Sequence, residues 1–351
     1  GTTMSLMGNL NVSSGTFPNG TAITISNNRG DQDVTLTCGS VTFTQLIISH
    51  TTAGGGDNNV TISSGCTMPM GASPTSVLAG LLTNNGTITV ASGIWTLSNS
   101  SGSFGSLAIT NNGTITHSGS GWVIQGGYTN GASGTVTYSG TTMSLMGNLN
   151  VSSGTFPSGL TTTFDNNRGD QNSILTPGSV TFGGITINKT SSLTFGLASN
   201  TTSTGAFIFT AGIVSNPASP ITLIVQGNYS QASTLTFGGS NLTLSMEGSS
   251  AATMSRTAGT ISSPIIINKS GGATVSLATN FTTGSTLAVQ AGTFGGATFT
   301  NTVTGLVTVS GGTYSAGSAT QTFNTGLTVS GGTFTGGSGT TDINGALTLS
   351  S

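Results

Sequence analysis

Hydrophobic and polar residues alternate along most of the chain in short segments that end at glycines. In LTVSGGTF, which begins at Leu327, the apolar residues Leu327 and Val329 alternate with Thr328 and Ser330, and two glycines follow. Successive side chains of a β-strand point to opposite faces, so the apolar residues are expected to point inward and the hydroxyls outward. The pattern predicts many short strands with glycine corners between them.

These segments recur with a regular period of about 20 residues, which is typical of a β-solenoid, whose strands pair with the coils above and below. Four sets of residues share this period: Leu287, Val307, Leu327 and Leu347; Gly272, Gly292, Gly312 and Gly332; Phe294, Tyr314 and Phe334; Val303, Phe323 and Ile343. Longer coils are expected toward the N-terminus, where NNGTIT recurs at a wider spacing, from Asn84 and Asn111, and places Trp95 over Trp122. We predict an all-β fold, a single continuous β-solenoid with roughly 20–27 residues per coil.

Larger repeats divide the chain into related modules. GTTMSLMGNLNVSSGTF from Gly1 recurs from Gly140, and a weaker third copy lies at 234–248. A second motif, INK followed by a polar turn, places Asn188 and Asn268 at equivalent positions. We interpret the offset between the first two copies as about seven coils, and the offset between the INK motifs as about four. The modules are 1–139, 140–238 and 239–351, all within one rod.

The repeated apolar residues are interpreted as core ladders. The aromatic set Phe294, Tyr314 and Phe334 has an alternative interpretation as an external stripe that binds sugar rings, because aromatic faces suit pyranose rings. Core stacking is the favoured interpretation.

Composition narrows the range of functions. Only 3% of the residues are charged and the net charge is −2, so the basic surface that nucleic-acid binding requires is missing. Gly, Ser, Thr and Asn are poor helix formers, and no apolar run is long enough to span a bilayer. His50 and His117 lie far apart in the sequence, and we expect both in solvated loops. We therefore expect no enzyme, no metal, no cofactor and no membrane insertion.

Two short features are candidate sites. NNRGDQ occurs twice, placing Arg29, Gly30 and Asp31 in one loop and Arg168, Gly169 and Asp170 in another. Arg-Gly-Asp is an integrin-binding tripeptide, so these are candidate adhesive loops; a local turn or Arg–Asp pair is the favoured alternative. Cys38 and Cys66 are separated by nearly the length of one long coil, which favours either a disulfide between neighbouring coils or two buried thiols.

Three segments carry a resemblance to a known group of proteins: GNLNVSSGTF from Gly8, ITINKTSSLTFGLASNTTSTG from Ile185, and LTVSGGTF from Leu327. With these repeats the chain resembles the arrays of secreted bacterial surface proteins, the filamentous-haemagglutinin-like and autotransporter-like adhesins. The resemblance implies a right-handed parallel β-helix outside the cell, acting as stalk, fibre or adhesin.

The leading functional expectation is a structural extracellular fibre or stalk. Repeat sequence runs up to Gly1 and Ser351, so we expect uncapped ends that stack head to tail on further copies of the chain. The first alternative is a surface adhesin that binds a glycan or receptor through its loops. A polysaccharide lyase or hydrolase, and an ice-binding protein with flat threonine rows, are further alternatives. Scarce catalytic groups disfavour the first of these, and the lack of a strict T-x-T register over many coils disfavours the second.

Overall fold

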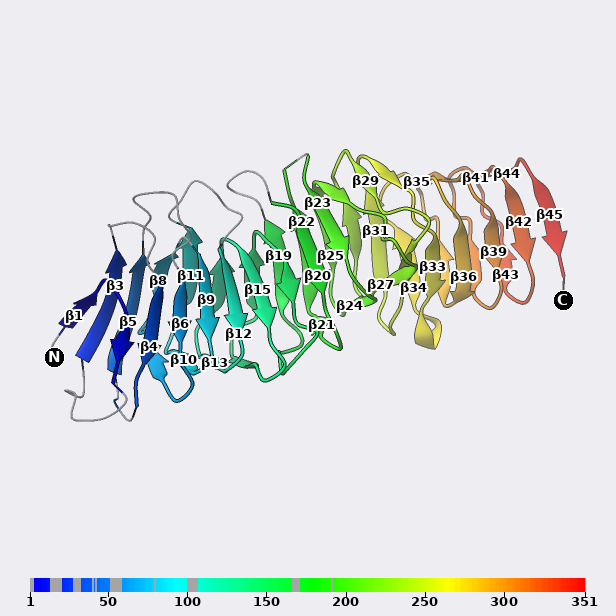
Figure 1. Ribbon diagram of the computed structural model, residues 1–351. Coiled ribbons are helices and arrows are strands. Elements are labelled where there is room, and N and C mark those ends of the chain that lie inside the picture. The colour runs from blue at the N-terminus through cyan, green and yellow to red at the C-terminus, as the bar shows by residue number, and fades with distance from the viewer. Residues whose placement is uncertain are drawn as a thin grey trace. The chain divides into compact units, whose positions relative to one another are not determined.

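The computed structural model describes residues 3–12, 21–27, 33–39, 41, 43–50, 59–78, 80–99, 107–165, 171–190 and 192–350. The chain divides into two compact units, Gly1–Val180 and Thr181–Ser351. Within each unit, short strands stack side by side as successive coils (Figure 1). The side chains that point to the inside of the coils are mostly apolar. The three repeat modules remain an interpretation of the sequence.

The described residues of unit 1 form three parallel sheets, which we call A, B and C. Sheet A contains β1 (Thr3–Leu6), β3 (Thr21–Asn27), β5 (Phe43–His50), β8 (Thr75–Leu78), β11 (Ile94–Asn99), β14 (Gly121–Ile124), β17 (Thr142–Leu145) and β19 (Thr161–Asp165). Sheet B contains β2 (Leu10–Asn11), β4 (Val34–Thr37), β6 (Val60–Ile62), β9 (Leu81–Asn84), β12 (Ala108–Asn111), β15 (Gly127–Asn130), β18 (Leu149–Asn150) and β20 (Ser173–Thr176). Sheet C contains β7 (Thr67–Pro69), β10 (Thr87–Val90), β13 (Thr114–His117) and β16 (Thr135–Tyr138).

Unit 2 has four parallel sheets. Sheet D contains β22 (Gly184–Asn188), β25 (Phe207–Ala211), β28 (Tyr229–Gln231), β31 (Ala252–Arg256), β34 (Thr274–Leu277), β37 (Thr293–Gly295), β40 (Thr313–Ser315) and β43 (Thr333–Thr335). Sheet E contains β21 (Thr181–Phe182), β24 (Thr201–Ser203), β27 (Ile221–Val225), β30 (Leu242–Met246), β33 (Ile265–Asn268), β36 (Leu287–Ala291), β39 (Val307–Val309), β42 (Gly326–Val329) and β45 (Ala346–Leu349). Sheet F contains β35 (Phe281–Thr283), β38 (Asn301–Val303), β41 (Gln321–Phe323) and β44 (Thr341–Ile343), and sheet G contains β23 (Thr194–Leu197), β26 (Ile213–Val214), β29 (Thr236–Phe237) and β32 (Thr260–Ile261).

The predicted all-β solenoid is confirmed, and the register fixes its coil lengths. Leu287, Val307, Leu327 and Leu347 are successive cross-strand partners, as the sequence period requires. In sheet B, Ile109 lies opposite Leu82 of the preceding coil and Tyr128 of the following one. The step from Leu82 to Ile109 is longer than the step from Ile109 to Tyr128. Coil length therefore varies along unit 1, because the turns between the strands differ in length.

The interpretation of the larger offsets in coils is wrong. Pairing leads from β1 through β3, β5, β8, β11 and β14 to β17, so the offset from Gly1 to Gly140 corresponds to six coils and not seven. The coils of unit 1 are longer on average than those near the C-terminus, which accounts for the difference. The two INK motifs do not lie a whole number of coils apart, since Asn188 ends a strand of sheet D and Asn268 ends a strand of sheet E.

The core consists of ladders of inward side chains. Trp95 lies opposite Trp122, and the stacked rings have centroids 5.2 Å apart. Phe294 and Tyr314 are fully buried and lie in register with Phe334, which confirms the core interpretation and excludes the external stripe. Stacking aromatic rings on one another buries a large apolar area in each coil, so each coil depends on its neighbours for stability.

Buried asparagines close the corner between sheets B and C. The amide nitrogen of Asn84 donates to Asn111 Oδ1 at 2.8 Å, and that of Asn111 donates to Asn130 Oδ1 at 3.0 Å. Asn130 in turn donates to the carbonyl oxygens of Gly134 and Ser153. These amides satisfy backbone groups that the turn would otherwise leave unpaired, which keeps the corner regular from coil to coil.

Helical structure is confined, in the described ranges, to one 3-10 turn at Ser270–Gly272. No helix among the described residues has the length and apolarity needed to cross a membrane.

Candidate functional site

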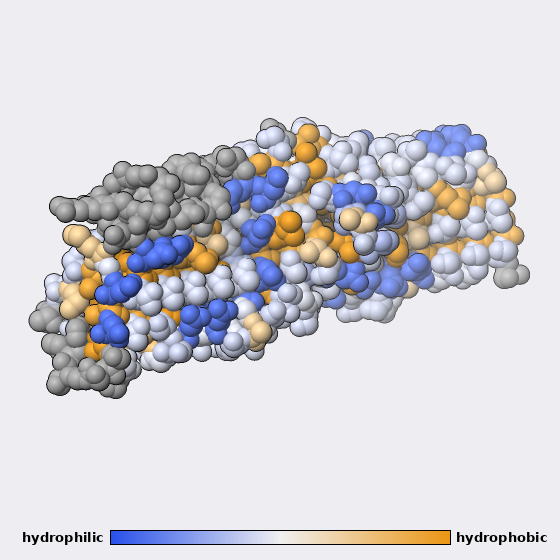
Figure 2. Space-filling model, in the orientation of Figure 1, coloured by the Kyte–Doolittle hydropathy of each residue, from blue (hydrophilic) through white to orange (hydrophobic). Residues whose placement is uncertain are grey.

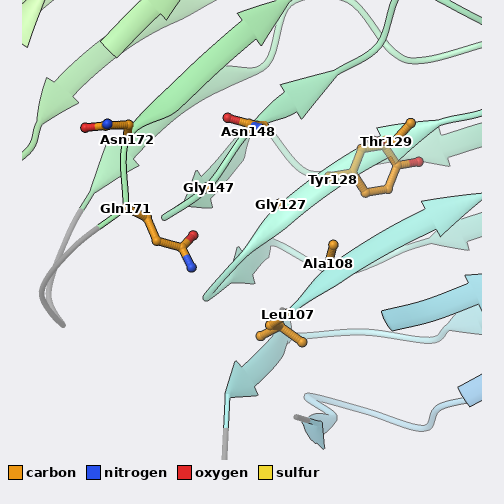
Figure 3. Close-up of a pocket in the computed structure, with 9 residues that line it drawn as sticks. All are labelled: Leu107, Ala108, Gly127, Tyr128, Thr129, Gly147, Asn148, Gln171 and Asn172. Atoms are coloured by element: carbon orange, nitrogen blue, oxygen red, sulfur yellow. The ribbon is translucent and has the colours of Figure 1, made fainter. Parts of the chain in front are cut away.

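A cavity of about 400 Å³ lies on the outer face of sheet B. The cavity arises from three cross-strand partners that point outward: Leu81, Ala108 and Gly127. The side chain becomes smaller from one coil to the next, and Gly127 has none. The chain therefore leaves a hollow over the start of β15, whose floor is the backbone of Gly127 and the methyl group of Ala108 (Figure 3). We call this hollow the β15 cavity.

Amide and hydroxyl groups surround the β15 cavity. Asn148, Gln171 and Asn172 line one side of it, Thr129 lines another, and Leu107 provides an apolar edge. Figure 3 shows the side chain of Gln171 extending into the space between these residues. The Gln171 Oε1 atom lies 3.1 Å from the place where a Cβ on Gly147 would be, so the missing side chain of Gly147 makes room for this amide.

Hydrogen bonds fix the orientation of the Asn148 amide. Asn148 Oδ1 accepts a hydrogen bond from the Ile174 backbone N–H at 2.8 Å, and the Asn148 carbonyl accepts one from Tyr128 N–H at 2.8 Å. Because the oxygen of the Asn148 side chain is engaged, its NH₂ end is the group left to face a ligand. Asn148 and Asn172 are exposed, whereas Gln171 and Thr129 are half-buried.

The described lining residues of the β15 cavity carry no charge. They offer hydrogen-bond donors and acceptors together with two small apolar surfaces, and they provide no carboxylate, imidazole or thiol for proton transfer or nucleophilic attack. The arrangement is suited to binding a neutral polar molecule.

His117 is buried, and the expectation of a solvated loop is wrong for it. It ends β13 with 1% exposure, in the inward column between Val90 and Tyr138. Its Nδ1 accepts from Gly119 N–H at 2.9 Å, and its Nε2 lies 2.9 Å from the Gly121 carbonyl oxygen, so Nε2 carries the proton.

Aromatic rings enclose the His117 side chain, with the ring centroid of Tyr138 4.7 Å away. Burial lowers the pKa of His117, and its hydrogen bond to the Gly121 carbonyl opposes that shift. A neutral imidazole with both nitrogens engaged has a structural role. The expected loop is wrong for His50 too, because His50 is the last residue of strand β5.

Two lysines that the sequence interpretation did not single out are fully buried. Lys189 and Lys269 each follow an INK asparagine and have 0% exposure. Lys269 Nζ donates to the Gln226 carbonyl at 2.8 Å and also to the Glu247 carbonyl. Burial lowers the Lys269 pKa, and the charge of Glu247 opposes that shift. Lys269 thus joins three coils through backbone carbonyls, and the repeated INK motif was the signal that could have identified it.

The candidate site residues from the sequence fall into two groups. Cys38 and Cys66 form a disulfide with Cα atoms 5.1 Å apart. Cys38 follows β4 and Cys66 precedes β7, so the bond joins neighbouring coils. Arg29, Gly30 and Asp31, and likewise Arg168, Gly169 and Asp170, lie outside the described residues. They remain candidate adhesive loops.

Sheet C presents a regular grid of threonines on its outer face. Thr87 and Thr89 of β10 pair in register with Thr114 and Thr116 of β13, and these pair with Thr135 and Thr137 of β16. The inward residues between them are buried, whereas each of these threonines is half-buried or exposed. Strict T-x-T register therefore does occur, over three neighbouring coils, and we call this surface the sheet C threonine grid.

Within the described residues, His, Cys, Asp and Glu side chains form no group of three or more that could hold a metal ion. Together these features define a parallel β-solenoid repeat protein. No protein-family model, no curated protein and no solved structure matches the chain.

Proposed function

We propose that the chain is a structural element of an extracellular fibre or stalk. The observation that supports this proposal is the register-matched parallel pairing of successive coils within each unit, with side-chain ladders inside. Every coil is held to the next by several sheets at once, so a load along the stack is shared among many backbone hydrogen bonds. Such a structure resists extension and proteolysis without catalytic groups.

The Cys38–Cys66 disulfide supports an extracellular location, because such bonds persist mainly in oxidising compartments. The low charge and the abundance of Gly, Ser and Thr agree with the resemblance to secreted bacterial surface proteins.

Self-association is the second part of the proposal. The last coil exposes Leu347 and Leu349, at 55% and 71%, beside an apolar hollow of about 500 Å³ that includes Phe334 and Ile343. Apolar side chains reach the surface at this end of unit 2 (Figure 2). An exposed strand edge with apolar side chains pairs with other edges. The partner that we propose is the first described coil of a second copy, in which β1 pairs with β3 alone among the described strands; a following coil of the same chain would occupy the same face.

Sedimentation velocity of the chain at increasing concentration tests self-association. We expect species larger than the monomer at micromolar concentration, and we expect the double variant Leu347→Asp, Leu349→Asp to remain monomeric. Thr348→Asp is the matched control, because Thr348 alternates with these leucines and faces the other side of β45. A monomer at all concentrations, or equal association of the leucine variant, would show that this face does not self-associate.

The sheet C threonine grid supports a second candidate function, the binding of ice or another regular lattice. Its rows are one strand spacing apart, about 4.8 Å, and its two columns are separated by two strand positions, about 6.6 Å. An uncharged array of hydroxyl and methyl groups in register can meet a repeating surface at many points. The double variant Thr114→Lys, Thr116→Lys should abolish inhibition of ice recrystallisation, whereas Thr110→Lys on sheet B should not. Lack of inhibition by the unmodified chain would exclude ice.

A further inference from the structure

We propose that the β15 cavity binds a neutral saccharide, with one or two sugar rings seated over Gly127. The inference is independent of the fibre function, because end-to-end stacking of coils leaves the outer face of sheet B uncovered. Gln171 is the last residue of the second NNRGDQ segment, and the Arg-Gly-Asp tripeptide before it lies outside the described residues.

The size of the cavity suits such a ligand. A volume of about 400 Å³ is at the lower end of the range for small-molecule sites. The volume exists because Gly127 and Ala108 occupy outward positions at which neighbouring coils carry larger groups, such as Leu81. The floor is therefore built from backbone, which is rigid because Gly127 N–H donates to the Leu107 carbonyl at 3.1 Å.

The polar groups suit hydroxyls that both donate and accept. A side-chain amide carries an NH₂ donor and a carbonyl acceptor, and the amides of Asn148, Gln171 and Asn172 line one side of the cavity. Asn148 contributes its NH₂ group, because its oxygen already accepts from the Ile174 backbone N–H. Thr129 provides a hydroxyl on another side. Adjacent hydroxyl groups of a sugar ring can each donate a hydrogen bond to an amide oxygen or accept one from an amide NH₂ group.

The apolar groups suit the remaining surface of a sugar ring. The methyl group of Ala108 lies at the floor of the cavity, where C–H groups of a ring can pack, and the nearly buried Leu107 borders it. The described lining residues carry no charge, so a carboxylate, phosphate or sulfate on the ligand would lose hydration without gaining an ion pair from them. The cavity therefore favours neutral sugars over acidic ones.

Saturation-transfer NMR and titration calorimetry of the full chain test this assignment. The probes are the methyl glycosides of glucose, galactose, mannose and N-acetylglucosamine, their β-1,4-linked disaccharides, and methyl glucuronide as the acidic comparison. We expect at least one neutral probe to bind with a Kd of about 1 mM or below, and the glucuronide to bind at least about tenfold more weakly.

Matched variants locate the binding. Ala108→Trp fills the floor of the cavity and should weaken binding at least about tenfold. Thr61→Trp, on the outer face of the same sheet two strands away and outside the cavity, should change binding less than about twofold. Asn172→Ala, at an exposed position, should also weaken binding and serves if Ala108→Trp fails to fold. The assignment is overturned if no neutral probe binds, if the glucuronide binds best, or if Ala108→Trp and Asn172→Ala both bind as the unmodified chain does.

Discussion

Val309→Asp tests the inward and outward faces of a strand. Val309 has 0% exposure in β39, and its cross-strand partners are Val289 and Val329. Its neighbour Thr308 points outward and is half-buried. An aspartate at position 309 places a carboxyl group inside the core, and an aspartate at position 308 places the same group on the surface of the same strand.

The expected cost follows from the burial of Val309. An aspartate with an ordinary pKa of about 3.9 must take up a proton at pH 7 to enter an apolar core, which costs roughly 4 kcal/mol at about 1.36 kcal/mol per pH unit. Loss of the buried valine side chain adds about 2 kcal/mol. We therefore expect Val309→Asp to destabilise its coil by roughly 6 kcal/mol at neutral pH, and Thr308→Asp by less than about 1 kcal/mol.

Hydrogen exchange read by mass spectrometry is the suitable assay, because coils of a solenoid can open separately. Peptides that cover β36, β39 and β42 should lose protection in Val309→Asp and keep it in Thr308→Asp. Part of the loss should be recovered near pH 4, since the buried carboxyl has a raised pKa and protonation then costs little. Equal loss in the two variants, or none in Val309→Asp, would refute the assigned faces of β39.

Three further predictions concern buried polar groups and the disulfide. Burial lowers the pKa of His117 in the folded state, so the stability that its neutral form contributes should be fully present above the unfolded-state pKa of 6.5. Below that pH the free energy of unfolding should fall, by at most about 1.4 kcal/mol per pH unit. Urea unfolding at pH 8 and pH 5 should show this fall in the unmodified chain and not in His117→Gln. Tyr314→Phe should cost about 1–3 kcal/mol, because Gln321 Oε1 loses the 2.7 Å hydrogen bond that the phenol donates; thermal melting measures it, and an unchanged melting temperature would contradict the buried network. Reduction of Cys38–Cys66, which joins two neighbouring coils, should lower the stability of unit 1 by about 3–4 kcal/mol; equal protection of β4 and β6 in reduced and oxidised chain would contradict this.

The sequence predicted the core ladders near the C-terminus well, because each column holds apolar residues at a constant spacing. Leu287 and Val307 are identified by counting, and so is the Trp95–Trp122 pair, since the motif around each tryptophan repeats. The burial of His117 was also accessible in principle. Its strand repeats the pattern of β10, where the same inward position is occupied by Val90.

The β15 cavity could not be found by counting. It depends on which outward residues of different coils become neighbours, and those coils differ in length. The step along the chain from Leu81 to its partner Ala108 is longer than the step from Ala108 to its partner Gly127. The position of each outward column is decided by how much chain each turn takes up, and composition gives no measure of that. For the same reason the sequence predicted equivalent positions for the two INK motifs, whereas they end strands of two different sheets, D and E.

The six-coil repeat of unit 1 has a consequence for how such a chain changes over generations. Thr3 pairs with Ala22 and Thr142 pairs with Thr161, so the two copies of the repeated block reproduce the same register. Genetic recombination between the copies would therefore add or remove six whole coils while every inward residue kept a partner of the kind it had before. The number of coils can therefore change without selection for a new core. Selection can then adjust the length of the solenoid in steps of six coils.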